Sequence, residues 1–215
     1  MKKIITLAMV VLISVAAQSQ NAKYVSSMER FIKMMNDAKT ADDFQNAANS
    51  FERIANAEPK EWLPNYYEAY IYSRIAIMEK DNTKKDALLD KGLDYATKAE
   101  KIAGENAEIK VVQSMLLGIK IGIDPQNRGQ KLGMQSGMYM QTAMKLDPTN
   151  PRAYLMQGQS LMYTPEQYGG GKDKAMKSLE KSVELFKTFK PSSSIMPTWG
   201  EVRASQALEE CKNME

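Results

Sequence analysis

The chain has 215 residues, of which 43% are hydrophobic, 29 are Lys or Arg and 26 are Asp or Glu. It contains one cysteine and no histidine, which excludes an intrachain disulfide, histidine-dependent catalytic triads and the usual zinc and copper sites. Positive and negative residues alternate along the sequence, so we expect no basic stripe and no nucleic-acid partner.

Residues 1–19 have the pattern of a secretory signal peptide. Two lysines precede an apolar stretch from Ile4 to Ala17, and small residues end that stretch before polar residues begin. Cleavage after Ala17 and cleavage after Ser19 both fit this pattern. The apolar stretch is too short to span a bilayer comfortably. We therefore predict one mature domain, residues 20–215, that is periplasmic or secreted and has no stable membrane insertion.

Helical periodicity runs through the rest of the chain, and no segment alternates as a strand would. Pairs such as Thr40 with Asp43 and Thr198 with Glu201 are typical of helix starts. Asp124, before Pro125, is another expected cap. We predict an all-α fold with helices over residues 23–37, 40–57, 60–80, 84–103, 106–122, 125–146, 151–163, 172–188 and 198–213.

Small residues and helix breakers recur in one register. Each breaker is followed ten positions later by a small residue, in the pairs Pro59 and Ala69, Gly104 and Ser114, and Pro148 and Gly158. The second helix of each pair has its own small residue, at Ala47, Gly92, Ser136 and Ala175. Helices approach closely only where a side chain is small, so this pattern predicts a solenoid of stacked antiparallel helix pairs.

The last of these repeats resembles the tetratricopeptide repeat family. The resemblance rests on the stretch from Pro148 to Tyr154 with Gly158, Leu161, Ala175, Leu179 and Ser182, and it extends more weakly over residues 40–188. It implies a right-handed solenoid with a concave groove. We expect the helix after the linker at Lys190–Ser194, which carries Trp199 and Cys211, to cap the open end. The repeats step by 44–45 residues instead of about 34, so HEAT-type repeats stay the alternative architecture.

In tetratricopeptide repeats the first helix of each pair lines the groove. Carried over to this chain, the resemblance implies groove residues that include Tyr66, Tyr70, Arg74, Arg152 and Tyr163. Tyrosine and arginine often dominate binding energy, because each buries a large area and keeps a polar tip. The alternative is that these side chains pack between helices.

Glu68, Gln113 and Gln157 form a second candidate set. They occupy equivalent places in three repeats, where the family usually has leucine. A polar group at such a place needs a partner or water, so we expect a hydrogen-bonding track along the groove. The alternative is that helix rotation turns these three side chains to solvent.

Two further motifs give weaker indications of a functional site. The Tyr168–Gly171 segment lacks the residues of a phosphate-binding loop, so we expect a flexible lid or a plain turn. Met134, Met138, Met140 and Met144 share one helix, and we expect them to fill gaps in the core instead of binding Cu(I). We expect no metal and no cofactor.

We predict a non-catalytic, monomeric, exported scaffold whose groove binds a protein or peptide partner. The alternative is a small-molecule carrier that feeds an uptake system. A deep, closed, apolar pocket beneath the Tyr168–Gly171 segment would favour the carrier, whereas an open, shallow groove would favour a protein partner. An enzyme that uses two carboxylates, such as Glu61 and Glu68, has no nucleophile, base or metal motif to support it.

Overall fold

The computed structural model describes residues 22–214, and every regular element in this range is helical. The predicted signal peptide lies outside the described residues. An N-terminal helix over residues 22–37 precedes α2 (Ala41–Ala57), α3 (Leu63–Met78), α4 (Asn82–Ala103), α5 (Ala107–Ile123), α6 (Pro125–Leu146), α7 (Pro151–Tyr163), a 3-10 turn (Glu166–Tyr168), α8 (Lys172–Thr188) and α9 (Glu201–Lys212). The predicted helix boundaries agree with these to within three residues.

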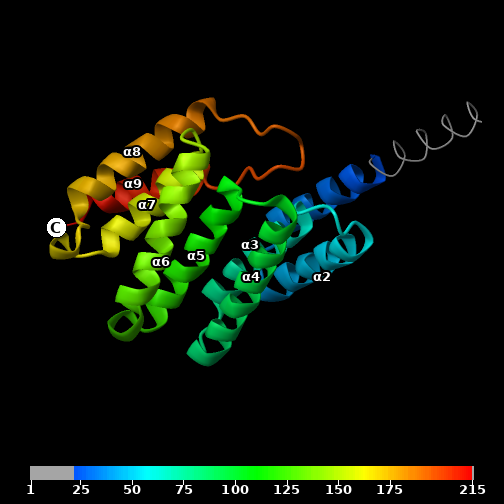
Figure 1. Cartoon of the computed structure of the whole chain (residues 1–215), viewed down its shortest axis with the longest axis horizontal. Helices are drawn as coiled ribbons and strands as arrows, with labels where there is room; N and C mark the ends of the chain where they lie inside the picture. Colours follow the sequence, from blue (N-terminus) through cyan, green and yellow to red (C-terminus); the bar gives the residue numbers. More distant parts are fainter. Residues whose placement is uncertain (1–21, 215) are drawn as a thin grey trace, which may run out of the picture.

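The helices form antiparallel pairs that stack along one axis (Figure 1). Helix α3 packs on α4, α5 on α6, and α7 on α8, while the first helices of successive pairs also contact one another. At the far end, α9 packs on α7 and α8 and buries Ala204, Ala207 and Cys211. The predicted solenoid and its C-terminal capping helix are therefore confirmed.

The helix ends follow the predicted caps with one exception. The Asp43 amide donates to Thr40 Oγ1 at 3.1 Å, and Asp43 Oδ2 accepts from the Thr40 amide at 2.9 Å. Asp124 caps α6 by accepting from the Asn127 amide. The predicted Thr198 cap is wrong, because α9 begins only after Gly200. The φ of Gly200 is 116°, which is outside the range of a right-handed helix, so the helix cannot start earlier.

The predicted small residues lie at the helix contacts. Ala47, Ala69 and Ala175 have no exposed surface. Ser114 and Ser136, which belong to different helices of one pair, bring their hydroxyl oxygens to 2.7 Å. Gly158 of α7 lies directly against the Leu179 side chain of α8. These contacts explain why small side chains recur at fixed spacing.

The connection between α8 and α9, residues 189–200, forms a non-helical segment with bends and turns, which we call the strap. It leaves α8, runs back toward the N-terminal repeats and returns to α9 (Figure 1). Ile195 is buried in the same core as Tyr67, and the Tyr67 hydroxyl donates to the Ile195 carbonyl oxygen at 2.8 Å. The Trp199 ring stacks on Tyr70, with 4.9 Å between ring centroids. The strap is thus packed structure, although its sequence suggests a plain linker.

The methionine prediction is correct for part of α6. Met140 is 4% exposed and fills the core, as expected. Met134 and Met138 are 63% and 60% exposed, so the prediction is wrong for them. Their side chains lie on the solvent-exposed side of the helix.

The Gly158 contact gives a test of the close packing. A Cβ atom on Gly158 would lie 2.5 Å from Leu179 Cγ and 3.3 Å from the Ala175 carbonyl oxygen. We expect Gly158→Ala to lose about 1–3 kcal/mol of unfolding free energy through overpacking. The matched change Gly118→Ala meets no atom within 4 Å and should be neutral or stabilise the helix by up to about 1 kcal/mol. Urea denaturation of both variants measures this difference, and equal effects would contradict it.

Candidate functional site

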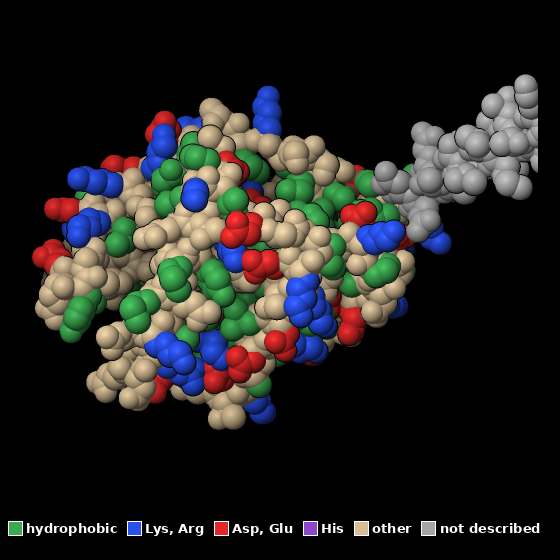
Figure 2. Space-filling model, viewed as in Figure 1, with side chains coloured by type: hydrophobic (Ala, Val, Ile, Leu, Met, Phe, Trp, Pro, Cys, Tyr) green, Lys and Arg blue, Asp and Glu red, His purple; other side chains and the backbone are tan. Residues whose placement is uncertain are grey.

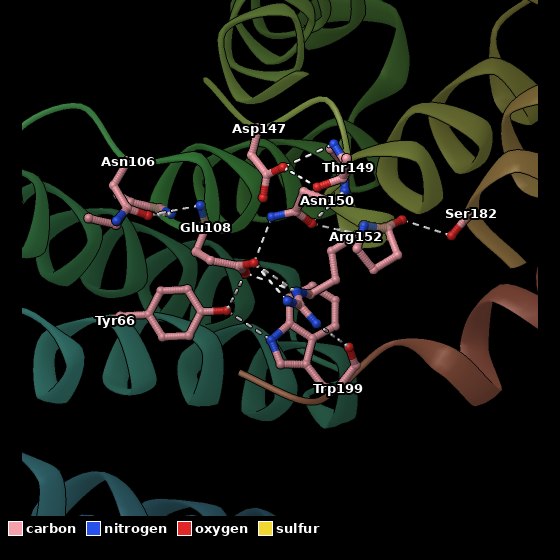
Figure 3. A network of polar contacts seen from close by, with 12 residues as sticks. Tyr66, Asn106, Glu108, Asp147, Thr149, Asn150, Arg152, Ser182 and Trp199 are labelled. Atoms are coloured by element: carbon pink, nitrogen blue, oxygen red, sulfur yellow. Dashed lines mark hydrogen bonds and ion pairs between the residues drawn. The ribbon is translucent and has the colours of Figure 1, made fainter. Parts of the chain in front are cut away.

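A buried ion pair joins two repeats on the first-helix side of the solenoid (Figure 3). Arg152 of α7 is 1% exposed, and Glu108 of α5 is 7% exposed. Arg152 donates from Nη2 to Glu108 Oε1 at 2.7 Å and from Nε to Oε2 at 2.9 Å. Its Nη1 donates to the Trp199 carbonyl oxygen of the strap at 3.2 Å. The guanidinium therefore holds α5, α7 and the strap together.

Further side chains saturate the Glu108 carboxylate. Asn150 Nδ2 donates to Oε1 at 2.6 Å, and the Tyr66 hydroxyl donates to Oε2 at 3.3 Å. Trp199 Nε1 donates in turn to the Tyr66 hydroxyl oxygen at 2.9 Å. Burial, and next the Glu108 charge, raise the pKa of Tyr66 well above its usual value, so Tyr66 is a neutral phenol. The network thereby extends to α3.

The strap changes the surroundings of three predicted groove residues. Tyr66 and Arg152 are each 1% exposed and belong to the buried network. Tyr70 is half-buried beneath Trp199. Their expected place in an open groove is corrected, because the strap covers this part of the first-helix face. Ligand binding by these residues stays a prediction that requires the strap to move.

Glu68, Gln113 and Gln157 face the second helices instead of the groove. Gln113 Nε2 donates to Glu100 Oε2 of α4 at 2.8 Å. Gln157 Oε1 accepts from Ser178 Oγ of α8 at 2.8 Å. Glu68 is 1% exposed and lies close enough to the Tyr95 hydroxyl of α4 for that hydroxyl to lower its pKa. The tetratricopeptide family usually has an inward-pointing leucine at these positions. The three polar side chains point the same way, so they contact other residues inside the fold.

Glu68 is the least well paired of these groups. Its Oε2 atom has no hydrogen-bond partner among the described residues. Burial raises the pKa of the Glu68 carboxyl to about 8, and the nearby Glu52 adds to the rise. The Tyr95 hydroxyl, which donates at 3.3 Å to Glu52 Oε1, is close enough to Glu68 to oppose the rise. Glu68 is therefore protonated at neutral pH.

The remaining predicted residues lie apart from this network. Arg74 is partly exposed, with its Cζ atom 6.0 Å from the centroid of the Phe44 ring. Tyr163 is 75% exposed at the end of α7. The glycine segment is a closed turn: the Gly170 amide donates to the Pro165 carbonyl, and the Gly171 amide donates to that of Leu161. Of the two expected forms of this segment, the structure has the plain turn.

A cleft of about 690 Å³ lies between the N-terminal helix and α2. This volume is within the range of small-molecule sites, about 300–1,000 Å³. Among its lining residues are Lys23, Tyr24, Arg30, Phe31, Arg53 and Ile54. Sequence reasoning did not select these residues, because Lys23, Tyr24, Arg30 and Phe31 precede the repeat region, and Arg53 and Ile54 lie on a second helix instead of a groove-lining first helix. The only available signal is the grouping of cations and aromatic rings on the first two helices.

The surface in Figure 2 carries charges of both signs, and Lys and Arg side chains lie among Asp and Glu without forming a continuous stripe. Hydrophobic side chains lie between the charged groups. Within residues 22–214, no helix combines the length and apolar character needed to cross a bilayer.

Removing one partner of the buried ion pair should destabilise the fold far more than removing one partner of an exposed pair. We expect Arg152→Met to lose about 3–5 kcal/mol of unfolding free energy, because it leaves the Glu108 carboxylate buried without its cation. The matched control is Arg203→Met, whose partner Glu210 lies at 2.6 Å and whose side chains are 38% and 48% exposed. That control should lose less than about 1 kcal/mol. Similar losses in urea denaturation would show that burial is not decisive.

Glu68 should make stability depend on pH. The unfolded carboxyl releases its proton near 4.5, whereas the folded one keeps it to about 8. Stability therefore falls as pH rises through this window, by at most about 1.4 kcal/mol per unit from this group. We expect Glu68→Gln to remove that slope and to exceed the wild type in stability at pH 8. Thermal unfolding at several pH values measures it, with the exposed Glu180→Gln as control. A wild-type slope retained by Glu68→Gln would refute this origin.

Comparison with known proteins gives two informative structures. No family model and no curated protein matches the sequence. A thermophilic TPR protein of Thermus thermophilus is similar with a TM-score of 0.57 and 15% identity, over 88% of this chain and 92% of that protein. This likeness supports the helical repeat fold alone.

The second similar structure is the HusA haemophore from Porphyromonas gingivalis. Its TM-score is 0.80, and the match covers 89% of this chain and 95% of the haemophore. The identity over this match is 34%. With that identity across nearly the whole haemophore, the chain belongs to the same family as HusA.

Proposed function

We propose that this protein is an exported carrier that binds haem without catalysing a reaction on it. The observation that carries the proposal is the similarity to the HusA haemophore, at 34% identity over 95% of that protein. Haem is a planar, largely apolar small molecule with two carboxylate side chains. The small-molecule alternative of the sequence analysis therefore has better support than a protein or peptide partner.

The packing of the strap also disfavours a peptide in the groove. Peptide recognition by tetratricopeptide-like repeats would use the first-helix face. Trp199 and Ile195 of the strap already cover Tyr66, Tyr67 and Tyr70 on that face. A peptide would have to displace a tightly packed segment, whereas a small ligand can bind elsewhere on the solenoid.

The composition restricts how the iron of haem could be bound. The whole sequence contains no histidine, so an imidazole ligand is excluded. The protein ligands that remain are methionine, tyrosine and cysteine thiolate. Cys211 has no exposed surface, and burial raises the pKa of its thiol. Binding would therefore depend chiefly on contacts with the ring and the carboxylates, with Met or Tyr as the possible iron ligands.

Titration of the expected mature chain, residues 20–215, with haemin tests this function. We expect a saturable change in the Soret band, without the spectrum of a histidine-ligated iron. Specific binding also stabilises the fold, by about 2.7 kcal/mol when free haemin is 100 times the dissociation constant. Absence of saturation, or a spectral change without stabilisation in urea denaturation, would overturn the proposal.

A further inference from the structure

The cleft beside the N-terminal helix has an apolar floor. Tyr24 and Ile54 are each 7% exposed, and Phe31 is partly exposed with its ring edge-on to Phe51 at a centroid distance of 6.2 Å. Aromatic and aliphatic side chains suit an apolar ring, because such contacts bury area with few fixed polar groups. The floor alone would accept many apolar molecules.

The rim of the cleft is cationic. Lys23, Arg30 and Arg53 all line it. None of the ion pairs found within residues 22–214 includes any of these three side chains. Arg53 donates to Ser50 Oγ at 3.1 Å, and the Arg30 Cζ atom lies 4.5 Å from the Phe31 ring centroid. The cleft therefore presents positive charge that is available to a bound anion.

Acidic groups are fewer on this surface. Glu58 lines the cleft, and its charge and that of Glu61 reach the Tyr24 hydroxyl. Among the described residues, three cations and one carboxylate line the cleft, and even with Glu61 nearby the cations outnumber the carboxylates at the rim. Arginines beside an apolar floor are typical of a site for an organic anion, because guanidinium groups bind carboxylates with directed hydrogen bonds.

The Tyr24 hydroxyl supplies a second indication of a ligand. It is buried and lines the cleft; Glu61 is close enough to interact with it, but no hydrogen bond of normal geometry joins it to the described residues. A buried hydroxyl without a well-formed hydrogen bond costs free energy, and a ligand oxygen in the cleft would reduce that cost. Burial, followed by the charges of Glu61 and Glu58, raises the pKa of Tyr24 above its usual value. Tyr24 is then a neutral donor, suited to a carboxylate and not to iron.

We infer that this cleft is the haem site, with the ring on Tyr24, Phe31 and Ile54 and the two haem carboxylates at Arg30 and Arg53. The inference rests on the proposed function, since the cleft by itself specifies only a planar organic anion. Lys23 adds positive charge at the same rim. The site lies at the N-terminal end of the solenoid and leaves the strap in place.

Charge reversal at the rim tests the site. We expect Arg30→Glu/Arg53→Glu to bind haemin at least about tenfold more weakly than the wild type, because both carboxylate contacts become repulsive. The matched control is Lys131→Glu/Lys177→Glu, which makes the same charge change on α6 and α8, away from the cleft. That control should bind haemin within about twofold of the wild type, since screening weakens distant charges. Circular dichroism checks that both variants fold.

Haemin dimethyl ester, which lacks the two negative charges, identifies the contact. The wild type should bind the ester more weakly than it binds haemin. The Arg30→Glu/Arg53→Glu variant should bind the ester about as tightly as the wild type binds the ester. An equal loss for ester and haemin would refute the carboxylate pairing. If charge reversal unfolds the chain, Arg30→Gln/Arg53→Gln replaces it, with a several-fold loss for haemin expected.

The outcomes separate the two proposals. If the wild type shows no saturable haemin binding, the proposed function fails. If the wild type binds haemin and both charge-reversal variants bind it equally well, the function stands and the cleft is not the site. Weakening by Lys131→Glu/Lys177→Glu to the same degree would assign the effect to net charge and would also overturn the site.

Discussion

The arrangement of the repeats depends on the buried pair between Glu108 and Arg152. These two residues come from successive first helices, and their partners Tyr66 and Trp199 add a third first helix and the strap. Burying two charges is costly unless every donor and acceptor is satisfied. Here the carboxylate accepts from three side chains, so this requirement is met in the observed stacking register. Apolar packing of helix pairs would tolerate small sliding, whereas this network does not.

The sequence predicts the fold well because its signals are local or periodic. Cap pairs such as Thr40 with Asp43 set helix ends, and small residues such as Ser114 and Gly158 mark where helices touch. The strap could not be predicted, because Ile195 and Trp199 make contacts more than a hundred positions away along the chain. Its serine-rich composition resembles a linker, and only the three-dimensional fold shows what it packs against.

The candidate site was less predictable for a related reason. The family resemblance selects positions by repeat register, which places Tyr66 and Arg152 on the first-helix face but gives no information on what covers that face. The same register identifies Gln113 and Gln157 as equivalent polar positions. It does not show which way they point, and their side chains face the second helices instead of the groove. The cationic cleft combines residues of the N-terminal helix, which precedes the repeats, with residues of α2, which is a second helix. The proposed ligand site thus lies where the repeat pattern gives no information on ligand binding.

The strap has a consequence for how the molecule folds and unfolds. In an ordinary repeat array each unit contacts only its neighbours, so the ends can fray independently. The hydrogen bond from Tyr67 to Ile195 joins residues that are 128 positions apart, so it connects the C-terminal part of the array to its N-terminal repeats. Contacts of such long range slow folding and couple the C-terminal segment to the N-terminal repeats. A chain that is still being synthesised would therefore lack part of its N-terminal core until the strap is complete.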